Sequence, residues 1–502
     1  MVNLRTENRV DVLRQAAVLL ERENARLIRA LNEVACEVAS LKGKGVDGLQ
    51  LEIARLREQL DARERALFGA STERSTGGGT DKNNAASRPE KPAQQGHGPK
   101  EQRELLRDEK VHELDEADRV CTSCGGELVA MAGQFEESEE VDVLKRQFVL
   151  VRHKRQKYRC ACGSCIETAL GQKKLQPRGR YSIDFAIEVA LSKYNAHLPL
   201  ERQVKLMRRE GLRVDSQTLW DQIEALARHL EGIPKRIRQH LLMQACIGAD
   251  ETHWRMMDKR GQDKGVNKRW YVWSLCGDDG VYYSITDNRS ADSVTALVGD
   301  YDGVLVTDGY KAYSSAKTKN GAKYTSAFCW AHVRRYFLAA QKAYPREAGV
   351  IVHLIDELFA IDRRLREKPP DDPLDARRRA SKPVLAALQH WAMTLKVLPD
   401  TAMGNAFAYM TKLWTGLVRF LDDACIPLSN NHTERAQRGV VVGRKNHYGS
   451  HSRRGTEVAA LFYSIIESCQ LVDVDPGVYI RAAVDARLEQ AVQALPHDIK
   501  TA

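Results

Sequence analysis

The sequence contains no apolar run long enough to cross a bilayer and no stretch that resembles a signal peptide. We therefore expect a protein of the cytoplasm, where thiols stay reduced. Its 11 cysteines then indicate metal ligands or core residues and argue against a disulfide-stabilised fold. Basic residues are only slightly in excess, with 77 Lys and Arg against 67 Asp and Glu. The total charge therefore identifies no partner, and its distribution matters more.

Large apolar residues are almost missing from residues 71–104, where Gly, Ser, Asn, Gln and charged residues dominate. A segment of this composition cannot bury enough apolar surface to order itself. We predict a flexible linker over residues 71–108. Elsewhere the chain is ordinary, with a hydrophobic fraction of 43%, and its length allows about three domains.

Residues 1–70 carry a pattern typical of a coiled coil, because apolar residues recur every seven positions in two offset series. The two series are Val10, Ala17, Asn24, Leu31 and Val38, and Leu13, Leu20, Leu27, Val34 and Leu41. A buried Asn at position 24 favours a two-stranded register. We predict self-association through this segment. An antiparallel hairpin across residues 43–48, or a helix packed on its own domain, is the alternative.

Residues 109–172 have the cysteine pattern of a zinc ribbon, which is two CxxC pairs separated by strand-like sequence. Four thiolates suit tetrahedral Zn²⁺. The expected ligands are Cys121, Cys124, Cys162 and Cys165, with Cys160 as an alternative to Cys162. Basic residues run through 152–157 and 172–182. They form either a solvated face or, as we favour, a surface that contacts DNA phosphates.

Residues 173–240 contain the pattern of a helix-turn-helix. A first helix is expected to end at Gly211, and Ser216 is the expected N-cap of a second helix. The same pattern occurs in ordinary helical packing, so DNA binding is an interpretation that the neighbouring basic ribbon favours.

The next region predicts an α/β domain. Three strand-like runs, then alternating helix and strand, occupy residues 241–339 and indicate a mixed sheet. A long helical insertion is expected over residues 340–428. The domain resumes at 429–472, and a C-terminal helical element follows at 473–502. The overall expectation is a multidomain α/β protein.

Three carboxylates are candidates for one metal centre. Asp250 ends a short apolar run, and Asp308 follows another run and precedes a glycine. Glu434 lies in a helical segment, where it could instead simply pair with Arg438 at i,i+4 spacing. Two strand-end aspartates and a later helical glutamate can converge on two Mg²⁺ or Mn²⁺ ions. Two such ions suit in-line phosphoryl transfer.

Four motifs resemble the catalytic domain of the insertion sequence 66 transposases: GADETHWRM, VLVTDGYKAY, CWAHVRRYF and NNHTERAQRGVVVGRKN. Other segments are similar to the outer parts of that family. LREQLDARERALFGASTERS resembles its leucine-rich segment, CTSCGGEL its zinc-binding domain, LPLERQ with SQTLWD its helix-turn-helix, and DPGVYIRAAVDARL its C-terminal element. The resemblance therefore covers nearly the whole chain, although CACGSC has one cysteine more than expected.

The resemblance implies a DDE transposase with a ribonuclease-H-like catalytic fold that a helical insertion interrupts. Carried over by position, the metal-binding triad is Asp250, Asp308 and Glu434. The residues expected to clamp DNA phosphates are Arg438, Arg444 and Lys445. The resemblance also singles out Asn446, together with Cys329 and His332. For Cys329 and His332, local packing is at least as good an explanation as chemistry.

The implied activity is transposition of a bacterial insertion sequence. The protein would bind the terminal inverted repeats, cleave their 3′ ends with Mg²⁺, and join them to target DNA. Expected partners are the two DNAs, further copies of this chain (at least a dimer) and small accessory proteins, with no membrane, at the nucleoid. A ribonuclease-H-like nuclease or junction resolvase would cut without joining. A zinc and helix-turn-helix regulator would need no triad.

Overall fold

The computed structural model describes residues 147–159, 166–257 and 269–499, with isolated positions at 115, 123, 125 and 130. The expected coiled coil, almost all of the linker and every expected zinc ligand, Cys160 included, lie outside these residues. The chain divides into two units, residues 69–146 and the remainder, and all helices and strands below belong to the latter. Among the described residues, no helix is both long and apolar enough to cross a membrane.

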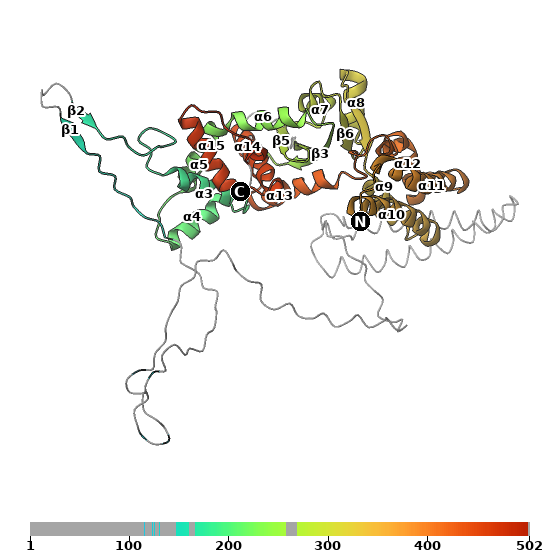
Figure 1. Ribbon diagram of the computed structural model, residues 1–502, viewed down its shortest axis with the longest axis horizontal. Helices are drawn as coiled ribbons and strands as arrows, with labels where there is room; N and C mark the ends of the chain where they lie inside the picture. The colour runs from blue at the N-terminus through green and yellow to red at the C-terminus, as the bar shows by residue number, and fades with distance from the viewer. Residues whose placement is uncertain are drawn as a thin grey trace, which may run out of the picture. The chain divides into compact units, whose positions relative to one another are not determined.

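The first described elements are a small hairpin and a group of helices (Figure 1). In the hairpin, Tyr158 pairs with Glu167 in antiparallel register. These elements are β1 (Lys157–Arg159), β2 (Ile166–Thr168), α3 (Ile183–Tyr194), α4 (Leu200–Arg209), α5 (Ser216–Leu230) and α6 (Gly232–Leu241).

A short turn joins α4 to α5, where the sequence predicts the helix-turn-helix. Gly211 adopts a φ of +89° there, which a glycine accepts without strain. The N-cap of α5 is Asp215 and not Ser216, because the Asp215 carboxylate accepts the backbone N–H of Thr218 at 2.6 Å. Two helices joined by a turn are therefore present, but their use in DNA binding is a separate question.

The predicted mixed sheet is confirmed. Its strand order is β5-β4-β3-β6-β7, with β3, β4 and β5 antiparallel and with β6 and β7 parallel to β3. The strands are β3 (Cys246–Trp254), β4 (Trp270–Cys276), β5 (Val281–Thr286), β6 (Val304–Thr307) and β7 (Thr325–Phe328). β4 reads as an almost unbroken apolar run because most of its side chains are buried, as in a sheet covered on both faces.

Two helices connect the parallel strands: α7 (Ala291–Val298) between β5 and β6, and α8 (Lys311–Asn320) between β6 and β7. The sequence places Asp308 at the end of this strand and before a glycine turn, and the structure agrees closely. The strand ends at Thr307 because Gly309 turns the chain with a φ of +84°.

The helices after the insertion are α13 (Asn431–His447), α14 (Arg453–Leu471) and α15 (Pro476–Leu488), followed by the 3₁₀ turn η3 (Pro496–Asp498). The first two cover the antiparallel half of the sheet, and α15 packs on α3, α5 and α14. α14 packs on β5, where the hydroxyl of Ser464 accepts the N–H of Tyr283 and that of Ser468 accepts the N–H of Val281, both at 2.9 Å. A first hydrophobic core fills this half and continues into α3, α5 and α6.

The segment expected as a helical insertion is helical and has a hydrophobic core of its own. Its helices are α10 (Pro345–Glu367), α11 (Pro373–Thr394) and α12 (Ala402–Leu417), with the 3₁₀ turn η2 (Arg419–Leu421), and they gather beside α9 (Trp330–Ala340) (Figure 1). Val306 of β6 and Ala327 of β7 belong to this second core. The insertion therefore packs against the parallel edge of the sheet.

Candidate active site

Asp250 and Asp308 lie at matching positions on neighbouring parallel strands. β3 pairs with β6 up to Gly248, which is opposite Val306, and each acid follows two residues later. Asp250 is the fifth of nine residues in β3 and does not end its strand, contrary to the sequence expectation. β3 continues because its other edge stays paired with β4 as far as Trp254. What ends near Asp250 is only the parallel ladder.

Helix α13 sits directly on β3 and carries Glu434 in its first turn. Gly248 allows this approach, because a Cβ there would collide with Thr433 and Asn430. The Asn430 amide donates to the carbonyl of Ala249 at 2.8 Å, and the Gln437 amide donates to the carbonyl of Asp250 at 3.2 Å. These two hydrogen bonds fix the position of α13 over β3. They thereby place Glu434 close to Asp250 and Asp308.

The acids are close enough to affect one another electrostatically. Burial, together with the charges of Glu251, Asp308 and Glu434, raises the pKa of Asp250 to about 8. The N–H of Glu251 donates to the Asp250 carboxylate at 2.9 Å and acts in the opposite direction. Several carboxylates therefore lie close together in a half-buried site, and their mutual repulsion favours the protonated form of Asp250.

Glu434 faces two groups on α9. Its Oε1 lies 3.5 Å from His332 Nδ1, and its Oε2 lies 3.6 Å from the guanidinium of Arg335. The histidine distance lacks hydrogen-bond geometry, so Glu434 Oε1 and His332 Nδ1 are both buried without a hydrogen bond. Burial lowers the pKa of His332, and the Glu434 charge opposes this effect. A buried carboxylate oxygen without a hydrogen bond, beside other acids, fits the donor set of a divalent cation.

Cys329 is close to the same carboxylate but has a structural contact. Its buried sulfur accepts the backbone N–H of Asn430 at 3.1 Å, which holds the start of α13 against the start of α9. The ligand atoms of Cys329, His332 and Glu434 lie within 4.8 Å of one another. Burial raises the pKa of the Cys329 thiol, so this sulfur is a poor nucleophile at neutral pH. The packing explanation is therefore favoured for Cys329.

The turn that carries Asp308 is held by the insertion. The Tyr409 hydroxyl of α12 donates to the Asp308 carbonyl, and a Cβ on Gly309 would collide with Leu413 of the same helix. The N–H of Tyr310 donates to the Asp308 carboxylate at 2.8 Å. A helical segment far away in the sequence therefore helps to set the position of this acid.

Comparison with known proteins identifies two family matches along the chain. The "Transposase IS66 family" matches residues 178–458, and the "zinc-finger binding domain of transposase IS66" matches residues 118–163. The chain belongs to the IS66 family of transposases. Membership of this family implies, in general terms, an enzyme that cleaves and transfers DNA. The zinc-finger match supports a structural zinc ion.

Two similar proteins come from Sinorhizobium fredii (strain NBRC 101917 / NGR234). "Uncharacterized protein y4hP" is 28% identical over 76% of this chain and 72% of its own length, and "Uncharacterized protein y4jD" is 29% identical over 73% and 74%. A solved structure, the "Mos1 transposase paired-end complex with left transposon end", is 14% identical over 44% of this chain and 80% of that chain. Its TM-score is 0.14, too low to support an argument.

The IS66-family chain also contains a paired carboxylate that sequence reasoning did not assign. Glu251, next to Asp250, has a side chain only 1% exposed and forms an ion pair with Arg289, and the Tyr313 hydroxyl donates to it at 2.7 Å. The Arg289 guanidinium lies 3.5 Å from the centre of the Tyr310 ring, in the Asp308 turn. Arg289 is 38 residues from Glu251 in sequence, so no local signal could have joined them.

The expected DNA-phosphate residues separate into two kinds. Arg438 and Lys445 are exposed on α13. Arg444 is only 8% exposed, and its guanidinium donates to the Thr252 hydroxyl at 3.1 Å and to the His253 carbonyl. An inward guanidinium that ties α13 to β3 does not fit the expected contact with DNA phosphates, so this expectation is corrected for Arg444.

Proposed function

We propose that this chain is a metal-dependent DDE transposase that binds the terminal inverted repeats of its element, cleaves their 3′ ends and joins them to target DNA. The observation that carries the proposal is the convergence of Asp250, Asp308 and Glu434 from three separate elements. Packing alone does not explain the cluster, because no ion pair within the described residues neutralises Asp250, whereas a buried acid normally has a cation or several donors beside it.

The sheet supports the finer fold assignment. Three antiparallel strands followed by two parallel ones, in the order β5-β4-β3-β6-β7, correspond to the ribonuclease-H-like fold that the sequence resemblance implies. In such a sheet the first acid belongs on the central strand and the second on its parallel neighbour, and Asp250 and Asp308 have these positions. The third acid comes from a helix that returns to the sheet after the insertion.

Two Mg²⁺ or Mn²⁺ ions held by the triad would generate the nucleophile and stabilise the charge that develops on the scissile phosphate. The protein's part is to hold the three carboxylates in place, and bound cations would favour the ionised form of Asp250, whose pKa is raised to about 8 without them. Asn430 and Gln437 hold Glu434 over β3, and the turn contacts of Tyr409 and Tyr310 hold Asp308. Water is the nucleophile for cleavage and the freed 3′-hydroxyl for joining, so no covalent protein–DNA bond is needed.

Exposed cations near the acids are suited to the DNA strand. Arg438 and Lys445 project from α13, and Arg335, whose side chain is 65% exposed, approaches Glu434 from α9. A second basic surface lies on α4, where Arg202, Lys205, Arg208 and Arg209 are all exposed. This surface, and not the face of α5 that bears Asp221, fits a DNA backbone. We assign the first surface to the reacting strand and the second to the element end.

The α4 surface has its own test. Changing Arg208 and Arg209 together to Gln should weaken binding to a labelled element end about tenfold and reduce the dependence of affinity on salt. Glu201→Gln, on the same exposed helix, is the matched control and should not weaken binding. An unchanged salt dependence in the Arg208 and Arg209 variant would remove α4 from the proposed DNA surface.

The assembly around the site follows from the sequence expectations. Cleavage at both element ends requires at least two active sites or the reuse of one, which agrees with a homo-oligomer formed by the N-terminal heptads. The zinc ribbon, with Cys121, Cys124 and Cys165 and with Cys162 or Cys160, would add a basic DNA-binding surface. Small accessory proteins of the same element remain part of this proposal.

The deciding experiment is joining of a labelled element end to a plasmid by the full chain with Mg²⁺. The wild type and Glu457→Gln, a change in an exposed ion pair on α14, should give joined product, and Glu434→Gln should give none. All three should bind the end equally. Cleavage without joining by the wild type would favour a nuclease or resolvase. Binding without either reaction, even after the element's other proteins are added, would favour a regulator.

A further inference from the structure

A second cluster of metal-binding side chains lies away from the acids. It consists of His240 at the end of α6, Asp279 in the turn between β4 and β5, and His497 in η3. The turn follows Cys276, which pairs with Gly248, so it lies at the end of the sheet where β3 begins. Asp250 is four residues further along β3 than Cys246, which corresponds to roughly 13 Å of strand. The cluster is therefore separate from the candidate active site.

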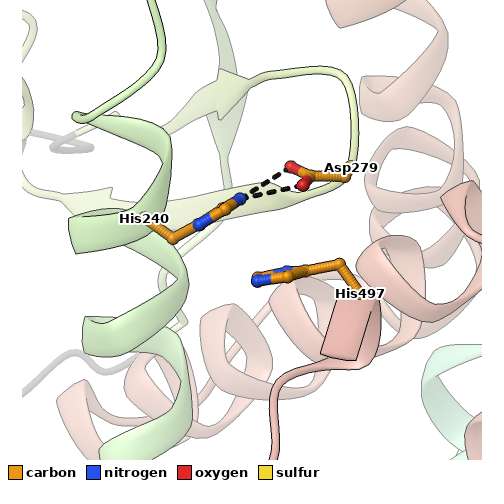
Figure 2. Close-up of side chains that lie close together, drawn as sticks. All are labelled: His240, Asp279 and His497. Carbon is orange, nitrogen blue, oxygen red and sulfur yellow. Dashed lines mark hydrogen bonds and ion pairs between the residues drawn. The ribbon is translucent and has the colours of Figure 1, made fainter. Parts of the chain in front are cut away.

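The three side chains point toward one another (Figure 2). The Nε2 of His240 lies 3.0 and 2.9 Å from the two oxygens of Asp279. The His497 ring is stacked on the His240 ring, with centroids 3.8 Å apart and an angle of 22° between their planes. One ligand atom from each of the three residues lies within 4.8 Å of the other two. Ligand atoms around a tetrahedral Zn²⁺ are roughly 3.4 Å apart, given Zn–N bonds of about 2.1 Å. Binding therefore requires the His497 ring to turn out of its stacked arrangement on His240, so that one nitrogen of each ring is directed at the ion.

Surrounding contacts hold the β4–β5 turn and the segment before η3 in place. The Gln244 amide donates to Asp279 at 2.6 Å, and its oxygen accepts the N–H of Asp278 at 3.2 Å, so the β4–β5 turn is fixed on α6. Near η3, the Tyr479 hydroxyl donates to the carbonyl of Ala494 at 2.9 Å. Second contacts of this kind orient metal ligands and preserve their geometry.

We propose that His240, Asp279 and His497 bind one divalent transition-metal ion of the zinc class. Two imidazoles and one carboxylate suit Zn²⁺, Ni²⁺ or Co²⁺ and are a poor set for Mg²⁺, which prefers oxygen ligands alone. The ion takes the place of the proton between His240 Nε2 and Asp279. In the metal-bound form the imidazole carries one proton, on Nδ1, and any second proton passes to solvent. The side chains of the three residues are 26%, 33% and 17% exposed, which leaves a path for the ion and for a water ligand.

The ion would join three parts of the chain that are far apart in sequence. His240 precedes Asp279 by 39 residues, and His497 lies close to the end of the chain. Binding therefore fastens η3 to the sheet domain at the end opposite the acids. The neighbouring Asp498, whose carboxylate is 3.6 Å from His497 Nε2, offers a further oxygen on the same side. The role is structural, in the manner of a crosslink, and independent of DNA chemistry.

The test is equilibrium dialysis of the full chain against micromolar Zn²⁺ with millimolar Mg²⁺ to occupy the acid site, followed by elemental analysis. The wild type should hold one zinc ion more than His497→Gln and one more than Asp279→Asn. His390→Gln, which changes an exposed histidine of α11, should match the wild type. Equal zinc content in all four proteins would overturn the proposal.

A second measurement uses the unaltered protein, in case a variant folds poorly. A crystal of the wild type soaked in Zn²⁺ should give an anomalous peak among His240, Asp279 and His497 at the zinc absorption edge. Zinc should also raise the thermal midpoint of the wild type more than that of His497→Gln, because an ion that binds only the folded state stabilises it. A crystal with zinc elsewhere and none in this cluster would count against the site.

Discussion

Two buried acids in different regions of the molecule have opposite surroundings: one has cationic partners and the other has further acids beside it. Asp362, in the helical insertion, forms ion pairs with Arg366 and with the buried Arg377, whose guanidinium also donates to several backbone carbonyls near η2. Asp250, in the sheet domain, has a backbone N–H and other acids beside it. In the insertion, charge is neutralised to hold helices together. At Asp250 no ion pair in the described part of the chain offsets the burial, as expected of a site that binds cations.

The largest expected effect comes from removing the charge at the acid site. Asp250→Asn should abolish end joining, by on the order of 10³-fold or more, because it removes an ionised metal ligand. Without metal, the same change should raise the free energy of unfolding at pH 8 by on the order of 1–3 kcal/mol, because it relieves a buried charge. The measurements are strand transfer with Mg²⁺ and urea unfolding in chelator. A variant both inactive and less stable would contradict the comparison.

The next effect concerns the neutralised acid. Arg377→Met leaves Asp362 buried with only an exposed partner, and it should destabilise the chain by about 3–5 kcal/mol. Arg379→Met, two positions along α11, alters an ion pair of which the arginine side chain is 75% exposed and should cost no more than about 1 kcal/mol. Denaturant unfolding of both proteins measures the difference. Equal losses would mean that burial does not distinguish these pairs.

A third buried acid sharpens the comparison through pH. Burial raises the pKa of Glu467, on α14, to about 7 from 4.5. Its protonated form is therefore favoured in the folded state, so the stability it contributes is present below pH 4.5 and is lost as pH rises through about 7. Glu467→Gln should be more stable than the wild type at pH 8, by at most about 3 kcal/mol, and equal to it near pH 4. Urea unfolding at both pH values measures this difference, with Glu457→Gln as the exposed control. A stabilisation independent of pH would contradict the raised pKa of Glu467.

The smallest expected effect concerns the contact between the helical insertion and the turn that carries Asp308. Tyr409→Phe removes the hydroxyl through which the insertion donates to the Asp308 carbonyl. The loss of one such hydrogen bond is expected to cost about 1 kcal/mol, or roughly fivefold in joining rate. Tyr336→Phe, in the ring stacked on Tyr409 at 4.4 Å, is the control and should retain the wild-type rate. If both variants kept that rate, the insertion would not help to position Asp308.

Much of the sheet could be read from the sequence, because strand and turn signals are local. The runs that became β3, β4 and β5 alternate or stay apolar over short lengths, and Gly280 marks the turn between the last two. The end of β6 is also marked locally, because Gly309 follows Asp308 and adopts the positive φ that begins the turn into α8.

The candidate site was only partly readable. Asp250 and Asp308 follow apolar runs, so their place at the sheet could be inferred, and Glu434 was proposed with them. The ion pair of Glu251 with Arg289 and the contact from Tyr409 to Asp308 could not. Both join residues by packing between elements, and side-chain contacts of this kind leave no periodic trace in either segment.

The sequence by itself determined the elements, the helical insertion and the chemical types available, because periodicity, glycine position and carboxylate placement are properties of short segments. Only the tertiary structure decided which groups meet. It directs the Arg444 guanidinium onto β3, and it places the Cys329 sulfur where it accepts the N–H of Asn430 at the start of α13. It also brings His240, Asp279 and His497 together. The physical reason is that these contacts depend on how helices pack on the sheet, which is set by the whole core and by no single stretch of the chain.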